Sequence, residues 1–135
     1  MNSAILKDIN FKENNILISL ELLKAKIIDD IKHFYFKIII TYENSCFEKE
    51  IVLFADDIQN LSIHNFTNDC PDYFFNEPDL WLTIIQLNNN DLILYINFDS
   101  GLNHMNIATE SGLSVRMNVT KESFNTFANN LKYFV

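Results

Sequence analysis

Glycine, proline and cysteine are scarce in this chain of 135 residues, and each occurs only twice. No linker rich in Gly, Ser or Pro divides the sequence, so we expect a single domain spanning residues 1–135. Cys46 and Cys70 lack the CxxC spacing of zinc ribbons and redox motifs, which predicts two reduced thiols. So few cysteines also favour a cytoplasmic location.

Positive charge is sparse as well. Ten Lys and Arg stand against eighteen Asp and Glu, which gives a formal net charge of -8, and Arg116 is the single arginine. Phosphate backbones and anionic membranes are bound through clusters of Lys and Arg, so we expect neither direct nucleic-acid binding nor membrane binding. A surface of this charge attracts a basic protein instead.

The sequence also lacks a long apolar run. Residues 1–11 contain no basic segment followed by an apolar stretch, which predicts a protein that is not exported. The densest apolar segment, residues 34–42, contains Lys37 and is shorter than the roughly 18 residues of a spanning helix. We therefore expect a soluble cytoplasmic protein, and twelve Phe within 48% hydrophobic residues can fill its core without disulfides or metals.

Apolar and polar residues alternate with a period of two along much of the chain, which is typical of β-strands. The alternation is clearest at residues 113–119, where Ser114, Arg116 and Asn118 mark the solvent face. Two runs, at residues 80–87 and 92–98, are almost continuously apolar and predict strands that are buried on both faces near their middle. Short polar segments between runs predict hairpins. Seven strands are expected, at residues 15–23, 34–42, 46–54, 80–87, 92–98, 104–109 and 113–119.

Two segments have helical spacing instead. Asp56 or Asp57 would cap an internal helix that extends to about Phe66. Thr120 would cap a terminal helix with an apolar face made of Phe124, Phe127, Ala128, Leu131 and Phe134. The expected fold class is α+β: a mainly antiparallel sheet of about seven strands, in a meander, half-barrel or sandwich, with one internal helix and a C-terminal amphipathic helix.

No catalytic or metal-binding pattern occurs in the sequence. His33, His64 and His104 stand apart, without HxH, HxxxH or HExxH spacing. No acidic stretch matches a calcium-binding loop, and neither a GxSxG motif nor a phosphate-binding glycine loop is present. We therefore expect no catalytic residue, no metal and no cofactor, and do not expect an enzyme.

One loop combines acidic and aromatic residues and is the candidate partner-binding site. Aromatic rings bury a large area at low entropic cost, and carboxylates steer a basic protein towards them. A second interpretation stays open, in which Phe74, Phe75 and Trp81 belong to the core and the carboxylates form a solvated rim. The candidate partner-binding residues are Asp69, Asp72, Tyr73, Phe74, Glu77, Asp79 and Trp81.

Three segments together resemble a known group of proteins: FYFKIIITYENSCFEKEIVLFADDIQNL at 34–61, DLWLTIIQLNNNDLILYINFD at 79–99 and GLSVRMNVTKESFNTFANNLKYF at 112–134. In this order a strand hairpin leads through an acidic helix start into a Leu-rich helix. A meander follows, and a strand, a Thr cap and a Phe-rich helix close the arrangement. It resembles the small immunity proteins of bacterial polymorphic-toxin and contact-dependent growth-inhibition systems. The resemblance contains no invariant motif, so no binding residue is carried over.

The resemblance implies a non-enzymatic cytoplasmic inhibitor that binds the C-terminal toxin domain of a cognate effector and blocks its active site or the approach of its substrate. Many such toxins are basic nucleases, in keeping with the net charge of -8. Two alternatives remain, an enzyme without a recognisable motif and a β-rich carrier of a small apolar ligand. The carrier requires a deep apolar cavity, where an immunity protein requires a filled core. A homodimer through an exposed sheet edge is compatible with every interpretation.

Overall fold

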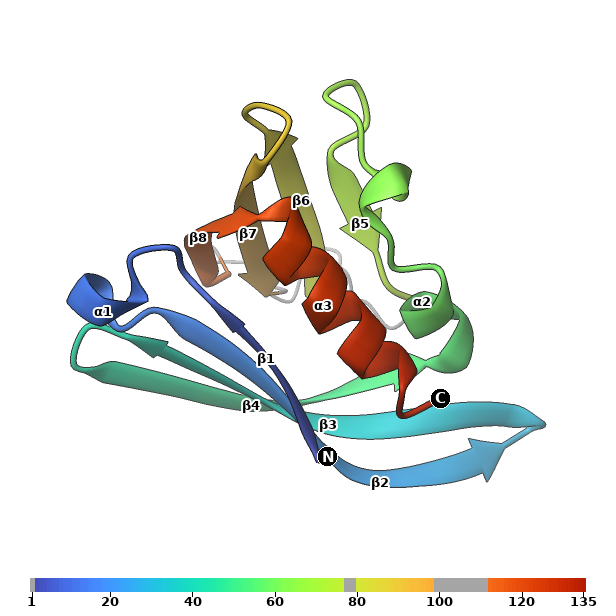
Figure 1. Ribbon diagram of the computed structural model, residues 1–135. Helices are drawn as coiled ribbons and strands as arrows, with labels where there is room; N and C mark the ends of the chain where they lie inside the picture. The colour runs from blue at the N-terminus through green and yellow to red at the C-terminus, as the bar shows by residue number, and fades with distance from the viewer. Residues whose placement is uncertain (1, 77–79, 99–111) are drawn as a thin grey trace.

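Two four-stranded antiparallel sheets make up most of the structure, a computed structural model that describes residues 2–76, 80–98 and 112–135 (Figure 1). The first sheet has the order β1-β2-β3-β4, with β1 Ser3–Lys7, β2 Leu17–Ile28, β3 Ile31–Tyr42 and β4 Ser45–Phe54. The second has the order β5-β6-β7-β8, with β5 Asp72–Phe74, β6 Leu80–Gln86, β7 Asp91–Phe98 and β8 Ser114–Thr120. The helices are α1 Phe11–Asn14, α2 Ala55–Gln59, the 3-10 turn η1 Ile63–Asn65 and α3 Lys121–Lys132.

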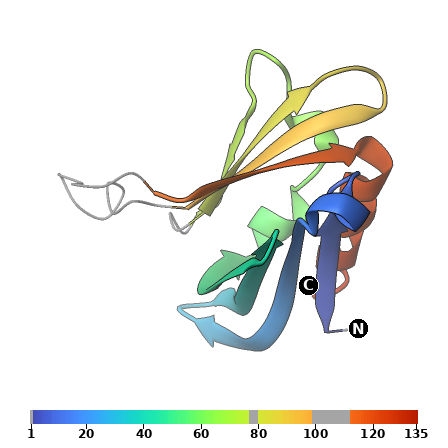
Figure 2. The same ribbon diagram turned by 90° about the vertical axis from the view of Figure 1, so that its left-hand side faces the viewer.

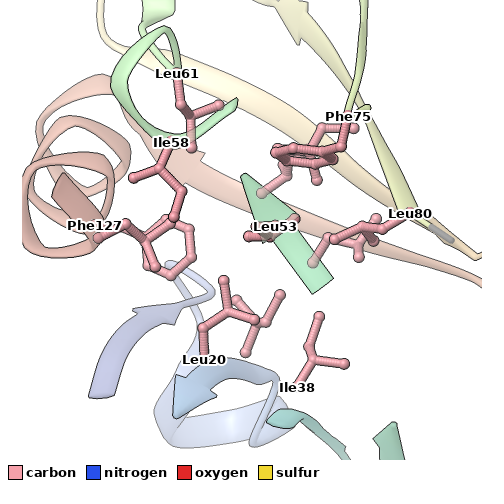
Figure 3. Close-up of a pocket in the computed structure, with 13 residues that line it drawn as sticks. Leu20, Ile38, Leu53, Ile58, Leu61, Phe75, Leu80 and Phe127 are labelled. Atoms are coloured by element: carbon pink, nitrogen blue, oxygen red, sulfur yellow. The ribbon is translucent and has the colours of Figure 1, made fainter. Parts of the chain in front are cut away.

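The two sheets lie one above the other, and α3 covers the side next to β1 (Figures 1 and 2). Each strand of both sheets turns alternate apolar side chains into the space between them, where Phe47 of β4 meets Phe98 of β7 with ring centroids 4.9 Å apart. Side chains from both sheets, α2 and α3 converge at the centre and leave a void of only about 20 Å³ (Figure 3). The core is therefore filled, as expected of a well-packed interior.

The terminal helix forms as its sequence predicts. The side chain of Thr120 accepts a hydrogen bond from Ser123 N at 3.0 Å, which satisfies one of the free N–H groups at the start of α3. The buried face of α3 contains Phe124 and Phe127, and Phe124 meets Phe66 edge to face at 6.1 Å. No helix in the described ranges is both long and apolar enough to cross a bilayer.

A buried carboxylate joins the two sheets at the end of β1. Asp8 is only 6% exposed, and its Oδ1 accepts a hydrogen bond from Asn118 N of β8 at 2.7 Å. Its Oδ2 accepts from Asn10 N and from Asn14 Nδ2, each at 2.8 Å. Burial alone would raise the pKa of the Asp8 carboxyl, but these three donors favour the charged form and lower the pKa below its ordinary value. Asp8 therefore acts as an ionised clamp between the corner of the first sheet and the second sheet.

The predicted α+β fold with antiparallel hairpins is confirmed, with corrections at particular elements. The internal helix is shorter than predicted: α2 ends at Gln59 with Asn60 as its C-cap, and a separate turn capped by Ser62 follows it. Strands β1 and β5 were not predicted, and β2 runs on to Ile28. The predicted strand at 104–109 lies outside the described residues.

The expectation that the hairpin of β6 and β7 is buried on both faces is wrong. Leu82, Ile84 and Leu94 on the inner face are buried, whereas Thr83 and Tyr95 on the outer face are only half-buried. The outer face borders no other described element, because α3 and the first sheet both lie on the inner side (Figure 2). The second sheet therefore has one face directed into the core and one open face.

Candidate functional site

The segment that follows β5 is anchored to the start of α2 by Asp57. Oδ2 of Asp57 accepts a hydrogen bond from Phe54 N, and Oδ1 accepts one from Asn76 N, both at 3.0 Å. The prediction that Asp56 or Asp57 caps the internal helix is therefore wrong: the N-cap of α2 is Phe54, and Asp57, the third residue of the helix, accepts from the N–H of that cap. Asp57 also fixes the segment after β5 through Asn76. Burial raises the pKa of the Asp57 carboxyl above its ordinary value, although the two backbone hydrogen bonds act in the opposite direction.

Tyr73 is part of this anchor and points inwards. Its hydroxyl donates a 2.6 Å hydrogen bond to the carbonyl oxygen of Asp57, and its ring lies 5.7 Å from Phe66 and 5.2 Å from Phe75. Phe75 is itself buried. Of the predicted site residues, Tyr73 therefore supports the loop from inside and presents little area to a partner.

Phe74 and Trp81 lie on the opposite, outer face of the second sheet. They are directly paired across β5 and β6, and their rings stack with centroids 6.0 Å apart at an angle of 24°. Phe74 is 66% exposed and Trp81 is half-buried. Because side chains alternate along a strand, the neighbouring Tyr73 and Phe74 point to opposite faces of β5. Tyr73 belongs to the interior and Phe74 to the surface.

A line of polar side chains crosses the four strands of the same face. Ser114 Oγ donates to Asn97 Oδ1 at 2.7 Å, and Asn97 Nδ2 donates to Thr83 Oγ1 at 3.0 Å. Thr83 Oγ1 in turn donates to Asp72 Oδ1 at 2.6 Å. Of these four residues, only Asp72 is among those that the sequence predicts for the site. The alternation in β8 already marks Ser114 as a solvent-facing residue, whereas the largely apolar runs of β6 and β7 concealed Thr83 and Asn97.

The remaining predicted residues are acidic. Asp69 is exposed between Thr67 and Cys70, which form an isolated β-bridge, and Asp72 is exposed on β5. Glu77 and Asp79 lie outside the described residues. The structure thus brings Asp72, Phe74 and Trp81 together on one face, and places Asp69 in the turn that precedes it.

Negative charge is concentrated in the part of the chain that builds this face. Residues 50–115 contain ten Asp and Glu and no Lys or Arg. This span includes β5, β6 and β7 in full. Arg116, paired with Tyr95 across β7 and β8, is the first cation after it. Among the described residues of the outer face, Asp72 of β5 and Asp91 of β7 are acidic, and Arg116 of β8 is basic.

No metal site is recognisable in the described ranges, where no three His, Cys, Asp or Glu side chains gather in a metal-binding group. His33 packs edge to face against Phe54 at 4.6 Å, and His64 is exposed in η1. His104 lies outside the described residues. Cys46 and Cys70 are both exposed and form no disulfide.

An apolar hollow opens between the sheets, beside the turn that joins β3 and β4. Its volume is about 430 Å³, and Ile16, Ile40, Phe47 and Val115 contribute to its lining. It is separate from the void of about 20 Å³ at the centre of the core. The described residues therefore enclose no deep central cavity of the kind that a carrier needs.

Comparison of the chain with models of known protein families finds no match, and comparison with curated proteins finds none either.

Replacement of Tyr73 by Phe tests the anchor. The variant leaves the carbonyl oxygen of Asp57 without its donor, so we expect it to lose about 1–2 kcal/mol of unfolding free energy in urea titrations at neutral pH. Burial, and then the charge of Asp57, raise the pKa of Tyr73 to about 12. The folded state thus favours the neutral phenol, and wild type should lose stability as the pH rises from 10 towards 12.

Tyr73→Phe has no phenol at this position, so it should not show the loss of unfolding free energy that Tyr73 causes between pH 10 and pH 12. Tyr42→Phe, which changes an exposed tyrosine, is the control and should leave the unfolding free energy unchanged. Equal effects of the two substitutions would contradict the anchoring role of Tyr73.

Proposed function

We propose that this protein is an immunity protein that binds and neutralises a basic toxin domain of a bacterial competitor system. The observation that supports the proposal is the open outer face of the second sheet. This face presents the stacked Phe74 and Trp81 in a part of the chain that is free of Lys and Arg. Exposed aromatic pairs are typical of binding hot spots, and a surrounding negative potential steers a basic protein towards them.

The polar side chains of this face are held in place before any partner binds. The hydrogen-bonded line from Asp72 to Ser114 satisfies the polar groups within the sheet, so they remain fixed without a ligand. A rigid, pre-organised surface loses little conformational entropy on binding, which favours high affinity. A partner on this face would bury on the order of 1,600 Å² in total. Binding of this kind blocks a toxin by covering its active site or the path of its substrate.

A carrier of a small apolar ligand is the second candidate, and the hollow beside the β3–β4 turn is the observation that favours it. A volume of about 430 Å³ is within the range of small-molecule sites. The hollow opens to solvent between two sheet edges, whereas the core itself is filled. The immunity function therefore accounts for more of the structure.

The proposed function is tested by calorimetric titration of the purified protein with the toxin domain encoded beside it. We expect a one-to-one complex whose association slows as salt is added, because the charges that steer it are screened. Co-expression should protect cells from the toxin. Absence of heat in the titration together with absence of protection would overturn the proposal. Saturable binding of a fluorescent fatty acid, abolished by Leu113→Asp at the exposed edge of the hollow, would support the carrier instead.

A further inference from the structure

The hairpin of β2 and β3 extends beyond the end of α3, at the right of Figure 1. We call residues 23–32 the hairpin tip, and all ten are exposed. Four of them are large aliphatic residues, and the most exposed is Ile27 at 72%; the set is Leu23, Ile27, Ile28 and Ile31. Large aliphatic side chains gathered on a projecting element mark an interaction surface.

The charges of the tip are arranged in order along the hairpin. Asp29 and Asp30 form its apex, between the directly paired Ile28 and Ile31. Three lysines, Lys24, Lys26 and Lys32, lie behind them on the two strands. At about 3.3 Å per residue, Lys26 and Lys24 lie roughly 10 and 17 Å from the apex. On the face of the paired Ile28 and Ile31, the negative apex is followed by this aliphatic pair, which we call the apolar collar, and then by Lys26 and Lys24. Ile27 and Lys32 are paired with each other on the opposite face.

The two residues that form the turn are unusual for a hairpin. Asp29 and Asp30 both have positive φ, 51° and 64°, as a two-residue type I′ turn requires. Asn-Gly is the preferred pair for this turn, because a side chain with a Cβ is strained in the left-handed region. The apex thus carries two carboxylates where an uncharged pair would form the turn more readily.

We propose that the hairpin tip is a self-association surface through which two copies of this chain form a closed homodimer. When two tips lie side by side and antiparallel about a two-fold axis, the apex carboxylates of each copy reach Lys26 and Lys24 of the other. The apolar collars then cover each other at the axis, in an isologous interface. The order of charge along one hairpin makes it complementary to a second copy. A bilayer does not suit it, because the two carboxylates would enter first.

This inference goes beyond the proposed function and is tested without any toxin. Sedimentation velocity of the full chain should show a reversible monomer–dimer equilibrium. The triple variant Ile27→Ser, Ile28→Ser, Ile31→Ser should weaken dimerisation by roughly tenfold or more, the loss expected when central apolar contacts are removed. The matched control, Ile5→Ser, Ile9→Ser, Leu87→Ser, changes three equally exposed aliphatic residues away from the tip and should dimerise as wild type does.

A second variant separates association from folding. Asp29→Asn with Asp30→Gly forms the preferred type I′ turn, so thermal unfolding should occur at the same or a higher temperature. Loss of the two carboxylates should nevertheless weaken the dimer, and the difference from wild type should shrink as salt screens the charges. A wild-type chain that stays monomeric up to its solubility limit would overturn the proposal. So would a dimer that the triple tip variant leaves intact.

Discussion

Replacement of Asp8 by Ala should lower the unfolding free energy by about 3–5 kcal/mol, the largest loss of stability that we expect from one polar substitution. The carboxylate is buried and receives three hydrogen bonds, from Asn10 N, Asn14 Nδ2 and Asn118 N. Its removal leaves three part-buried donors without their acceptor, and each donor suffers a desolvation penalty to the extent that water cannot replace the carboxylate. The bond to Asn118 joins elements 110 residues apart, so the connection between the sheets is weakened as well.

The effect depends on pH in a defined direction. Because the folded-state pKa of Asp8 lies below the ordinary value of 3.8, the folded state favours the ionised group. This stabilisation is fully present above pH 3.8 and is lost as the pH falls through the lowered pKa. Urea titrations at neutral pH and at successively lower pH should therefore show the curves of wild type and Asp8→Ala converging in acid.

The control is Asp69→Ala, which removes an exposed carboxylate and should change the unfolding free energy by less than about 0.5 kcal/mol. Asp8→Asn should fall between wild type and Asp8→Ala, because its amide oxygen can still accept from one of the donors. An Asp8→Ala protein as stable as the Asp69 variant would show that Asp8 does not clamp the sheets.

The strands and helix that the sequence predicts correctly are those whose pattern is decided locally. Alternation along β8 and the Thr120 cap of α3 depend on neighbouring residues, and both are present as expected. Strand β1 is different, since its five residues carry too little pattern and its place is set by pairing with β2 and packing against α3. Strand β5 has only three residues and likewise depends on its partner β6.

The candidate site was predictable in its residue types but not in its faces. The sequence indicated an acidic and aromatic loop, yet whether Tyr73 or Phe74 points outwards depends on the register between β5 and β6. A shift of one residue would exchange the two side chains, and nothing within the loop fixes that register. Asn97 and Ser114 lie far from the loop in sequence and join it only through the pairing of β6, β7 and β8. Their place in the site can be predicted only when the order of the strands in the second sheet is known.

Replacement of Phe74 or Trp81 by Ala should weaken binding to the cognate toxin domain by about 2–4 kcal/mol each, or roughly 30- to 1,000-fold in Kd. Both rings lie on the open face, and their stacking holds each ring in the orientation in which a partner would meet it. The double variant should lose less than the sum of the two single losses, because each ring supports the other.

Stability measurements distinguish a binding defect from an unfolded protein. Phe74 is largely exposed, so Phe74→Ala should unfold at nearly the wild-type urea concentration while its affinity falls. Tyr133→Ala is the matched control, since Tyr133 is an aromatic residue of similar exposure on the far end of α3 and should bind normally. Full affinity in both Phe74→Ala and Trp81→Ala, with protection by the wild-type protein intact, would place the toxin on another surface. The hairpin tip would then be the next region to substitute, because its aliphatic residues form the other exposed apolar cluster described above.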